Sequence, residues 1–515
     1  PEAVVALLAV ASIGAVWTSA PPEFGVRAVV DRFGQVEPVV LIAVEGYQYG
    51  GRRIDRRDHL DQLRRDLPSL RHTVVVSYPE RTSTGPDVVG WDDLLVEAAE
   101  RLEHQPVPFS HPLYVLYSSG TTGKPKAIVH GHGGIICEHV KALALHHDLG
   151  PGDRFFWYST TGWMMWNYLV SGLIVGAAIV LFDGDPASPD LLALWRLASA
   201  ARVTFLGLSA PFIDACRRAG LRPTESLDLA PLRAVGSTGA PLTAAGARWV
   251  STATRPDVQL SSISGGTDVC TAFVGGCPVV EVRAGEISCR YLGAHVQAWD
   301  EAGRAVVGCR GELVVTQPMP SMPVALWGDA DDSRLKEAYF EQHPGVWTHG
   351  DWITIHADGS CVITGRADAT LNRGGVRLGT AEIYAVVDDL AAVDDSLVVH
   401  LEDDAGGSGR LVLFVVVHEG ASLDDGLRAE ISGALRRSLS PRHAPDEIVA
   451  VPAIPRTLSG KRLEVPVKRI LQGAPVSDVA SRDTLGDPEA LDAFVALARA
   501  APPPTRPGSS QKSHE

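Results

Sequence analysis

The sequence predicts an α/β protein with a second, smaller α+β domain toward its C-terminal end, and three observations carry this prediction. The chain has 515 residues, several times the size of one hydrophobic core, so two or more domains are expected. Short apolar runs alternate with amphipathic stretches through the first two thirds, as in buried strands joined by crossover helices. Near residue 365 a Gly-rich stretch ends this alternation and a different pattern begins.

The first segment, "PEAVVALLAVASIGAVWTSAPP" (1–22), is apolar but is not predicted to be a signal peptide or a membrane span. It has no basic start and is interrupted by Ser12, Gly14 and Thr18, which favours a buried helix leading into a strand. The chain lacks an initiator Met and begins inside an element, so we expect an N-terminal portion to be missing.

The remaining strands of the large domain are predicted from further apolar runs. These runs are 72–78, 113–119, 177–183 and 202–208.

The small domain is predicted over 368–475. After the Gly-rich loop come a helical pattern at 380–390, a strand at 411–417, and a second helix with leucine or isoleucine at four-residue spacing from Leu423 to Leu439. Ser422 is placed to cap that helix and Pro441 to end it. The sequence then predicts one more amphipathic helix in an extension, 476–499, and a disordered tail, 500–515.

Charge and cysteine content exclude several classes of protein. Lys and Arg number 46 and Asp and Glu 61, a net charge of 46 − 61 = −15, which argues against nonspecific nucleic-acid binding and offers no basic strip for membranes. The 7 cysteines are odd in number and lack a C-x-x-C pair, so neither a disulfide framework nor a zinc site is predicted. The simpler interpretation of this cysteine content is that the protein works in a reducing cytoplasm. The sequence carries no signal for oligomeric state.

A loop rich in hydroxyl groups, "YSSGTTGKPKAIVHGH" (117–132), follows one predicted strand. Its glycines allow close backbone approach, its Ser and Thr side chains offer donors, and Lys124 and Lys126 add positive charge, so it suits a polyphosphate. It is not a Walker A loop, because Pro125 follows Gly123-Lys124 where Ser or Thr would stand. The alternative is a flexible surface loop.

Four histidines near this loop, His130, His132, His146 and His147, raise the question of a metal cluster. The first two lie on a strand-like stretch and the other two follow a separate helix, without a carboxylate at ligand spacing. Ordinary core histidines are therefore favoured.

Five separated motifs, in order, resemble those of the adenylate-forming (AMP-binding) superfamily of acyl-CoA synthetases. They are the loop above, "GSTGAPL" (236–242), "SISGGTDV" (262–269), "WTHGDW" (347–352) with "ITGRADATLNRGGVRLGTAEI" (363–383), and "PRTLSGKR" (455–462). The resemblance runs from Pro1 to about residue 495. It implies a large N-terminal adenylate-forming domain, 1–367, truncated at its start, and a small mobile C-terminal domain.

The resemblance also implies the residues that bind ATP. They are Thr121, Thr122, Gly123, Lys124 and Lys126 for the phosphates, Gly239, Ala240 and Pro241 for adenine, Ser264, Gly266 and Thr267 near the α-phosphate, and Asp351, Arg366 and Arg377 for ribose or phosphate. Asp268 stands where the family usually has a glutamate that helps to hold Mg²⁺, and its shorter side chain puts the reach in question.

Three further positions relate to the small domain. Lys461 matches the lysine that this domain inserts during adenylation, Asp368 falls at the hinge, and Gly374 and Gly375 fall where backbone lies against the pantetheine of coenzyme A in related enzymes. Thr267, Asp268 and Lys461 are thus the expected catalytic residues.

The implied chemistry follows from the weakness of a carboxylate as an electrophile. Attack on the α-phosphorus of ATP releases pyrophosphate and attaches AMP as a leaving group, which the thiol of coenzyme A then displaces. Lys461, the loop lysines and Mg²⁺ would offset the charge of the first transition state. No covalent enzyme nucleophile is needed.

The acid is predicted from two places. In "STTGWMMWNYLVSGL" (159–173), Trp163, Met164 and Trp166 provide bulk where the family lines its acyl pocket, although core packing would account for some of them. Gly265 stands where acetate-specific members have tryptophan, so we expect additional room there. The combination resembles the members that use acetoacetate, which is the predicted substrate.

Two alternatives stay open. One is another short acid, namely acetate, propionate, butyrate or 3-hydroxybutyrate. The other is a truncated, noncatalytic remnant that binds nucleotide or a protein partner.

Overall fold

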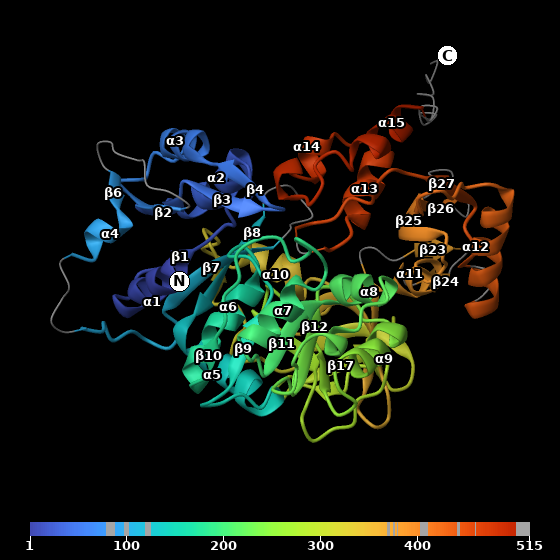
Figure 1. Cartoon of the computed structure of the whole chain (residues 1–515), viewed down its shortest axis with the longest axis horizontal. Helices are drawn as coiled ribbons and strands as arrows, with labels where there is room; N and C mark the ends of the chain where they lie inside the picture. Colours follow the sequence, from blue (N-terminus) through green and yellow to red (C-terminus); the bar gives the residue numbers. More distant parts are fainter. Residues whose placement is uncertain are drawn as a thin grey trace, which may run out of the picture. The chain divides into compact units, whose positions relative to one another are not determined.

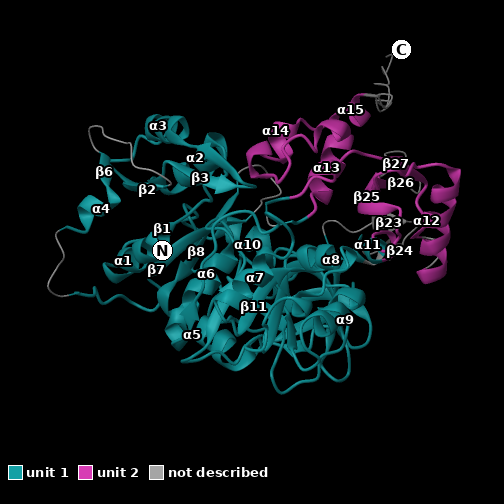
Figure 2. Cartoon of the chain, in the orientation of Figure 1, with its two compact units in different colours: residues 1–370, 379–385, 457–461 teal, residues 371–378, 386–456, 462–515 magenta. Residues whose placement is uncertain are grey.

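The computed structural model describes residues 1–78, 88–96, 102–118, 125–367, 371–373, 376–378, 380–401, 410–439, 443–458 and 460–500 (Figure 1). The chain divides into two compact units (Figure 2). Unit 1 comprises 1–370, 379–385 and 457–461, and unit 2 comprises 371–378, 386–456 and 462–515. This division does not test the predicted domain bounds, which stay predictions. Those bounds are 1–367, 368–475, 476–499 and 500–515.

A five-stranded parallel sheet, in the order β10-β9-β11-β12-β13, forms the centre of unit 1. Its strands are β9 (Arg154–Trp157), β10 (Ala178–Ile179), β11 (Phe205–Ser209), β12 (Ala234–Thr238) and β13 (Gln259–Ser262). The helices that accompany them along the chain are α6 (Met164–Val170), the 3₁₀ helix η2 (Ser171–Val175), α7 (Ala193–Ala200), α8 (Ala210–Arg218), the 3₁₀ helix η3 (Pro223–Glu225) and α9 (Ala244–Ala253).

Both faces of this sheet are covered. Along β9, Phe155 and Trp157 belong to one hydrophobic core, whereas Phe156 belongs to another that includes residues of α7, α8 and α9. Because successive side chains of a strand point to opposite faces, a run without polar residues is what a doubly covered sheet requires. The α/β prediction is confirmed, although the strand predicted at 177–183 is limited to β10.

Three smaller sheets and their helices form the start of unit 1. A parallel sheet in the order β2-β5-β6 and the hairpin β3-β4 accompany α2, α3 and α4, and β1 pairs with β7 in the sheet β1-β7-β8-β20. The bounds are α1 (Glu2–Ser12), β1 (Trp17–Thr18), α2 (Val26–Val36), β2 (Val40–Val44), β3 (Gly46–Tyr49), β4 (Arg52–Asp55), α3 (Arg57–Asp66), β5 (His72–Val76), β6 (Val88–Gly90), α4 (Trp91–Leu94), β7 (Pro112–Ser118), β8 (Lys126–Gly131), α5 (His132–Val140), the π-helix η1 (Lys141–His146) and β20 (Ala325–Leu326). The helix and strand predicted in the first segment are confirmed as α1 and β1, but α1 is only partly buried, with Val5 and Leu8 each 49% exposed. No helix among the described residues has the length and apolar character needed to cross a membrane.

Two antiparallel sheets complete unit 1. They have the orders β14-β15-β16 and β18-β17-β19-β21-β22. Their elements are β14 (Ser264–Gly266), β15 (Thr271–Gly275), β16 (Cys289–Arg290), β17 (Val296–Trp299), β18 (Ala305–Val306), β19 (Arg310–Val315), α10 (Ser333–Phe340), β21 (Trp347–Ile355) and β22 (Cys361–Arg366).

Unit 2 is built on the sheet β25-β26-β27 and the hairpin β23-β24. The elements from here to the C-terminal end are β23 (Leu371–Arg373), β24 (Val376–Leu378), α11 (Thr380–Val387, shared between the units), β25 (Val393–Leu401), β26 (Arg410–Val417), α12 (Asp425–Ser438), β27 (Glu447–Ala450), α13 (Glu464–Leu471), α14 (Val476–Val479), the 3₁₀ helix η5 (Arg482–Thr484) and α15 (Asp492–Ala500).

Two local predictions in unit 2 are wrong. Asp424 caps α12, because its carboxylate accepts a hydrogen bond from the Leu427 amide, so Ser422 is not the cap. The single helix predicted in the extension is divided into α14, η5 and α15, with Gly486 and Pro488 in the interruption. Proline lacks the amide proton that a continuous helix requires.

Candidate active site

The segments predicted to bind substrates lie at one edge of the molecule's main sheet because they follow strands of the same parallel sheet. The stretch with Trp163 follows β9, Gly239 to Pro241 follow β12, and Ser264 to Asp268 follow β13. Carboxyl ends of parallel strands meet at one edge of a sheet, where ligands of open α/β sheets bind. Thr238 joins two of these segments, since its hydroxyl donates to the carbonyl of Ile263 at 3.0 Å.

Asp268 lies in the turn between β14 and β15, and two side chains from elsewhere hold it. Its Oδ1 accepts hydrogen bonds from Lys126 Nζ at 3.1 Å and from the hydroxyl of Tyr339. Burial alone would raise the pKa of Asp268, but the positive charge of Lys126 and the hydrogen bond from the Tyr339 hydroxyl oppose it, and the pKa lies well below its ordinary value. The carboxylate is therefore ionised at neutral pH.

Tyr339, on α10, organises this group. Its ring stacks on Trp347 with centroids 3.7 Å apart, and Lys126 Nζ lies 4.5 Å from the ring centroid. Burial and the neighbouring Asp268 charge raise the pKa of Tyr339, so the phenol stays protonated and donates. The aromatic stack thus fixes the hydroxyl that orients Asp268.

Asp351 and Arg366 face each other across the β21–β22 pair. Arg366 Nη1 donates to Asp351 Oδ1 at 3.2 Å and to the carbonyl of His349 at 3.1 Å. Asp351 is buried, and its other oxygen lies 3.6 Å from His349 Nε2. The predicted ribose pair is thus brought together on one hairpin.

His349 lies beside Asp351 and was missed by the sequence interpretation. Its ring lies close to Gly266, where an added Cβ would come within 2.9 Å of His349 Cε1, and it packs edge-on against Phe273. Burial lowers the pKa of His349 more than the nearby aspartates raise it. The imidazole beside Asp351 is therefore neutral at pH 7.

His130 supports the same turn from β8. Its Nε2 donates to the carbonyl of Thr267 at 3.0 Å, and burial lowers its pKa to about 4. The backbone beside Asp268 is thus held by a neutral histidine.

The space predicted at Gly265 is not present. A Cβ on this residue would lie 2.0 Å from the carbonyl oxygen of Thr271 and 2.5 Å from Ala272 Cα. The β14–β15 pairing is irregular between Ser264 and Gly265, which places the backbone of β15 where a side chain would stand. The absence of a side chain here permits close strand approach rather than opening an acyl pocket, and a substrate contact at Gly265 stays a prediction.

The predicted acyl-pocket side chains lie at the start of α6. Trp163 precedes the helix, Met164 and Trp166 are buried in the main core, and Trp166 stacks on Trp17 with centroids 6.3 Å apart. Core packing therefore accounts for Trp166 at least in part, and the substrate role of the three stays a prediction.

Lys461 lies in a tight turn. Its amide donates to the hydroxyl of Thr457 at 3.1 Å, and its carbonyl accepts from the Thr457 amide at 2.9 Å. Of the other predicted residues, Thr121 to Lys124, Asp368, Gly374 and Gly375 lie outside the described residues, and Arg377 is described only as a backbone position in β24.

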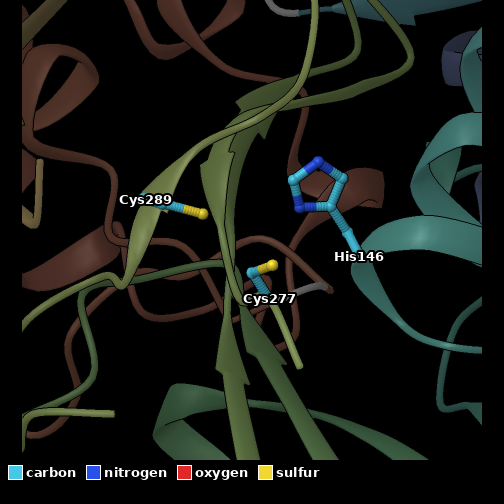
Figure 3. A group of neighbouring side chains, drawn as sticks. All are labelled: His146, Cys277 and Cys289. Atoms are coloured by element: carbon cyan, nitrogen blue, oxygen red, sulfur yellow. The ribbon is translucent and has the colours of Figure 1, made fainter. Parts of the chain in front are cut away.

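A cluster of two thiols and one imidazole lies elsewhere in unit 1 (Figure 3). The ligand atoms of His146, Cys277 and Cys289 lie within 4.8 Å of one another, a proximity that cysteine spacing did not predict because the β15–β16 pairing creates it. His146 Nδ1 bonds the carbonyl of Gly276 at 2.9 Å and Nε2 accepts from the Leu292 amide at 3.0 Å. Both ring nitrogens thus have backbone partners, as in a structural core histidine.

Comparison with known proteins identifies the family. The model of the AMP-binding enzyme family matches residues 1–322, and that of the AMP-binding enzyme C-terminal domain matches 382–461. The acetoacetyl-coenzyme A synthetase of Rhizobium meliloti (strain 1021) is 44% identical over 96% of this chain and 76% of its own length. The chain belongs to the acetoacetyl-CoA synthetase family. The acetoacetyl-CoA synthetase of Mus musculus is 41% identical over 96% of this chain and 74% of its own length.

Solved structures agree with this assignment. The acetoacetyl-CoA synthetase from Streptomyces lividans superposes with a TM-score of 0.91 at 49% identity, covering 97% of this chain and 76% of that one. The anthranilate CoA ligase AuaEII, with a TM-score of 0.71 at 22% identity over 88% of this chain and 81% of its own, shares the fold. The chain therefore has the adenylate-forming fold of its family.

Proposed function

We propose that this protein joins acetoacetate to coenzyme A through an acetoacetyl-adenylate, giving acetoacetyl-CoA, AMP and pyrophosphate. The observation that carries the proposal is similarity to acetoacetyl-CoA synthetases along 96% of the chain. The Lys126–Asp268 and Arg366–Asp351 pairs support it, because cations offset phosphate charge and carboxylates can hold a metal ion or ribose hydroxyls.

In the adenylation step the carboxylate of acetoacetate attacks the α-phosphorus of ATP. We assign Thr267 to the α-phosphate, Asp351 and Arg366 to the ribose, and Lys126 and Lys461 to the charge that builds up as pyrophosphate leaves. The phosphate-loop residues 121–124, Arg377 and Gly239 to Pro241 are assigned to the rest of the nucleotide. Trp163, Met164 and Trp166 are assigned to the acid.

Asp268 fits a magnesium ligand. Its carboxylate is kept ionised, Oδ1 is occupied by Lys126 and Tyr339, and Oδ2 lies toward Gly266, where an added Cβ would come within 3.1 Å of it. An oxygen of this kind is what Mg²⁺ prefers. Bound there, Mg²⁺ would neutralise phosphate charge, while Lys126 and Tyr339 keep the carboxylate oriented.

In the second step the thiol of coenzyme A displaces AMP from the adenylate. We assign Gly374 and Gly375 to the pantetheine and Asp368 to the hinge about which the small domain moves. We also propose a cytoplasmic location, which the 7 free cysteines support.

The test is ATP–pyrophosphate exchange with acetoacetate, using the purified protein and its Lys461→Ala variant. Exchange should depend on acetoacetate and fall about 10³-fold in the variant, because a preorganised cation is lost from the transition state. Conversion of synthetic acetoacetyl-AMP with coenzyme A should persist. Wild-type protein that binds ATP but shows no exchange with any short acid would indicate a noncatalytic remnant instead.

A further inference from the structure

The turn that carries Lys461 is closed at its base by two arginines. Arg456 and Arg462 pair as an antiparallel bridge, and Thr457 and Lys461 bond each other directly inside it. Gly460 has a φ of +84°, a left-handed conformation that favours glycine and tightens the turn. The backbone that presents Lys461 is therefore short and has two defined arms.

Both arms are bonded to one carboxylate, Asp395 on β25. Arg456 donates through Nε to Oδ2 at 2.8 Å and through Nη2 to Oδ1 at 2.6 Å, a bidentate pair. Arg462 Nη2 donates to the same Oδ1 at 2.7 Å. The amide of Ser396 also donates to Oδ1, at 2.8 Å, which fixes the Asp395 side chain on its own strand.

A second carboxylate completes the group. Asp388, just after α11, accepts from Arg462 Nη2 at 2.5 Å and from the hydroxyl of Ser396 at 2.5 Å. The four charged side chains are 15% to 24% exposed, so solvent screens them less than surface ion pairs. Burial alone would raise the pKa of Asp395, but the two arginines outweigh it and lower the pKa.

We propose that Asp395 is a positioning residue for Lys461, acting through Arg456 and Arg462, which hold both arms of the turn. The proposal rests on the role assigned to Lys461 in the proposed function. Asp395 limits where the backbone can present a long, flexible side chain, and a displacement of about 1 Å at a reacting centre can cost about 10²-fold in rate.

The decisive variant is Asp395→Asn, which keeps the size of the side chain and removes its charge. Acetoacetate-dependent ATP–pyrophosphate exchange should fall about 10- to 100-fold, because the turn loses its anchor. Conversion of synthetic acetoacetyl-AMP with coenzyme A should be unchanged, since that step does not use Lys461. Asp394→Asn is the matched control: Asp394 lies next to Asp395 and bonds His418 at 2.9 Å on the surface, so both half-reactions should keep their rates.

A second readout follows the turn itself. Limited trypsin digestion, with cleavage after Lys461 detected by mass spectrometry, should be faster in Asp395→Asn than in the wild type or Asp394→Asn. Arg456→Lys keeps the charge but loses the bidentate pair, and it should show the same selective loss to a smaller degree. Combining Arg456→Ala with Asp395→Ala should cost less than the sum of the single changes, because both act through one contact.

The outcomes separate the two proposals. Equal loss of both half-reactions in Asp395→Asn and Arg456→Lys, or unchanged exchange in both, would overturn the positioning role while leaving the function intact. If Lys461→Ala itself kept full exchange, the role assigned to Lys461 would fail, and the positioning role with it.

Discussion

The Asp268–Asp351 region and the Lys461 turn hold their charged groups in two different ways. In the first, the functional atoms themselves are bonded: Asp268 Oδ1 to Lys126 and Tyr339, Asp351 Oδ1 to Arg366. In the second, the bonds are made by the neighbours of Lys461 in the chain, Arg456 and Arg462. The bonds of the first region hold the charged groups themselves, whereas the bonds at the turn hold the backbone that carries Lys461.

Because the two regions hold their charged groups differently, a substitution should have a different effect in each. A change in the first region should alter binding of nucleotide and metal, because charges that meet the ligand lose their partners. A change around the turn should alter only the half-reaction that uses Lys461. Three substitutions in the first region, at Asp351, Tyr339 and Gly265, test this difference.

Asp351→Asn should have the largest effect of the three. It removes the charge that pairs with Arg366 and lies beside His349, and it removes one proposed acceptor for the ribose hydroxyls. KM for ATP should rise about 10²-fold, in the range for a buried, charged hydrogen bond. Asp358→Asn, in the turn of the same β21–β22 hairpin and paired with Arg283 on the surface, is the control and should leave KM unchanged. A lower kcat with unaltered KM would assign Asp351 to the chemical step instead.

Tyr339→Phe should have an intermediate effect. The ring keeps its stack on Trp347, but Asp268 loses one donor, which leaves it held by Lys126 alone. We expect about a tenfold change in the Mg²⁺ concentration needed for half-maximal exchange, the equivalent of one hydrogen bond to a charged group. Direct titration of the ATP-bound protein with Mn²⁺, followed by electron paramagnetic resonance, should show the same shift. Identical metal dependence in variant and wild type would mean that Tyr339 does not orient Asp268.

Gly265→Ala should have the smallest effect on activity and act on stability. Its Cβ would meet the backbone of β15 at 2.0 Å, so strands must separate, at a cost of about 1 to 3 kcal/mol. Thermal unfolding should therefore begin at a lower temperature, while the preference among acids stays the same. A stable variant that selects a shorter acid would restore the interpretation of Gly265 as a wall of the acyl pocket.

Much of the site could be predicted because its motifs follow strands directly. Gly239 to Pro241 and Ser264 to Asp268 need only the order of parallel strands to meet at one edge. Tyr339 and His349 could not be found in this way, because Tyr339 is 71 residues from Asp268 and no local pattern marks either. Gly265 was misinterpreted because a strand irregularity, invisible in the sequence, decides what fills its place.

Two features of the fold that the sequence did not predict correctly have similar local causes. Ser422 and Asp424 are both good caps, and only the carboxylate reaches the Leu427 amide. The thiols of Cys277 and Cys289 are neighbours because of antiparallel pairing between β15 and β16, not because of their spacing. A single sequence does not predict contacts that depend on strand register or on segments far apart in the chain.

We infer that this protein activates acetoacetate, and its preference between two acids tests this inference most directly. The measurement is kcat/KM for acyl-CoA formation with acetoacetate and with butyrate, which lacks the 3-oxo group, using the same preparation and saturating ATP, Mg²⁺ and coenzyme A. We expect a higher kcat/KM for acetoacetate. A higher value for butyrate would contradict this inference.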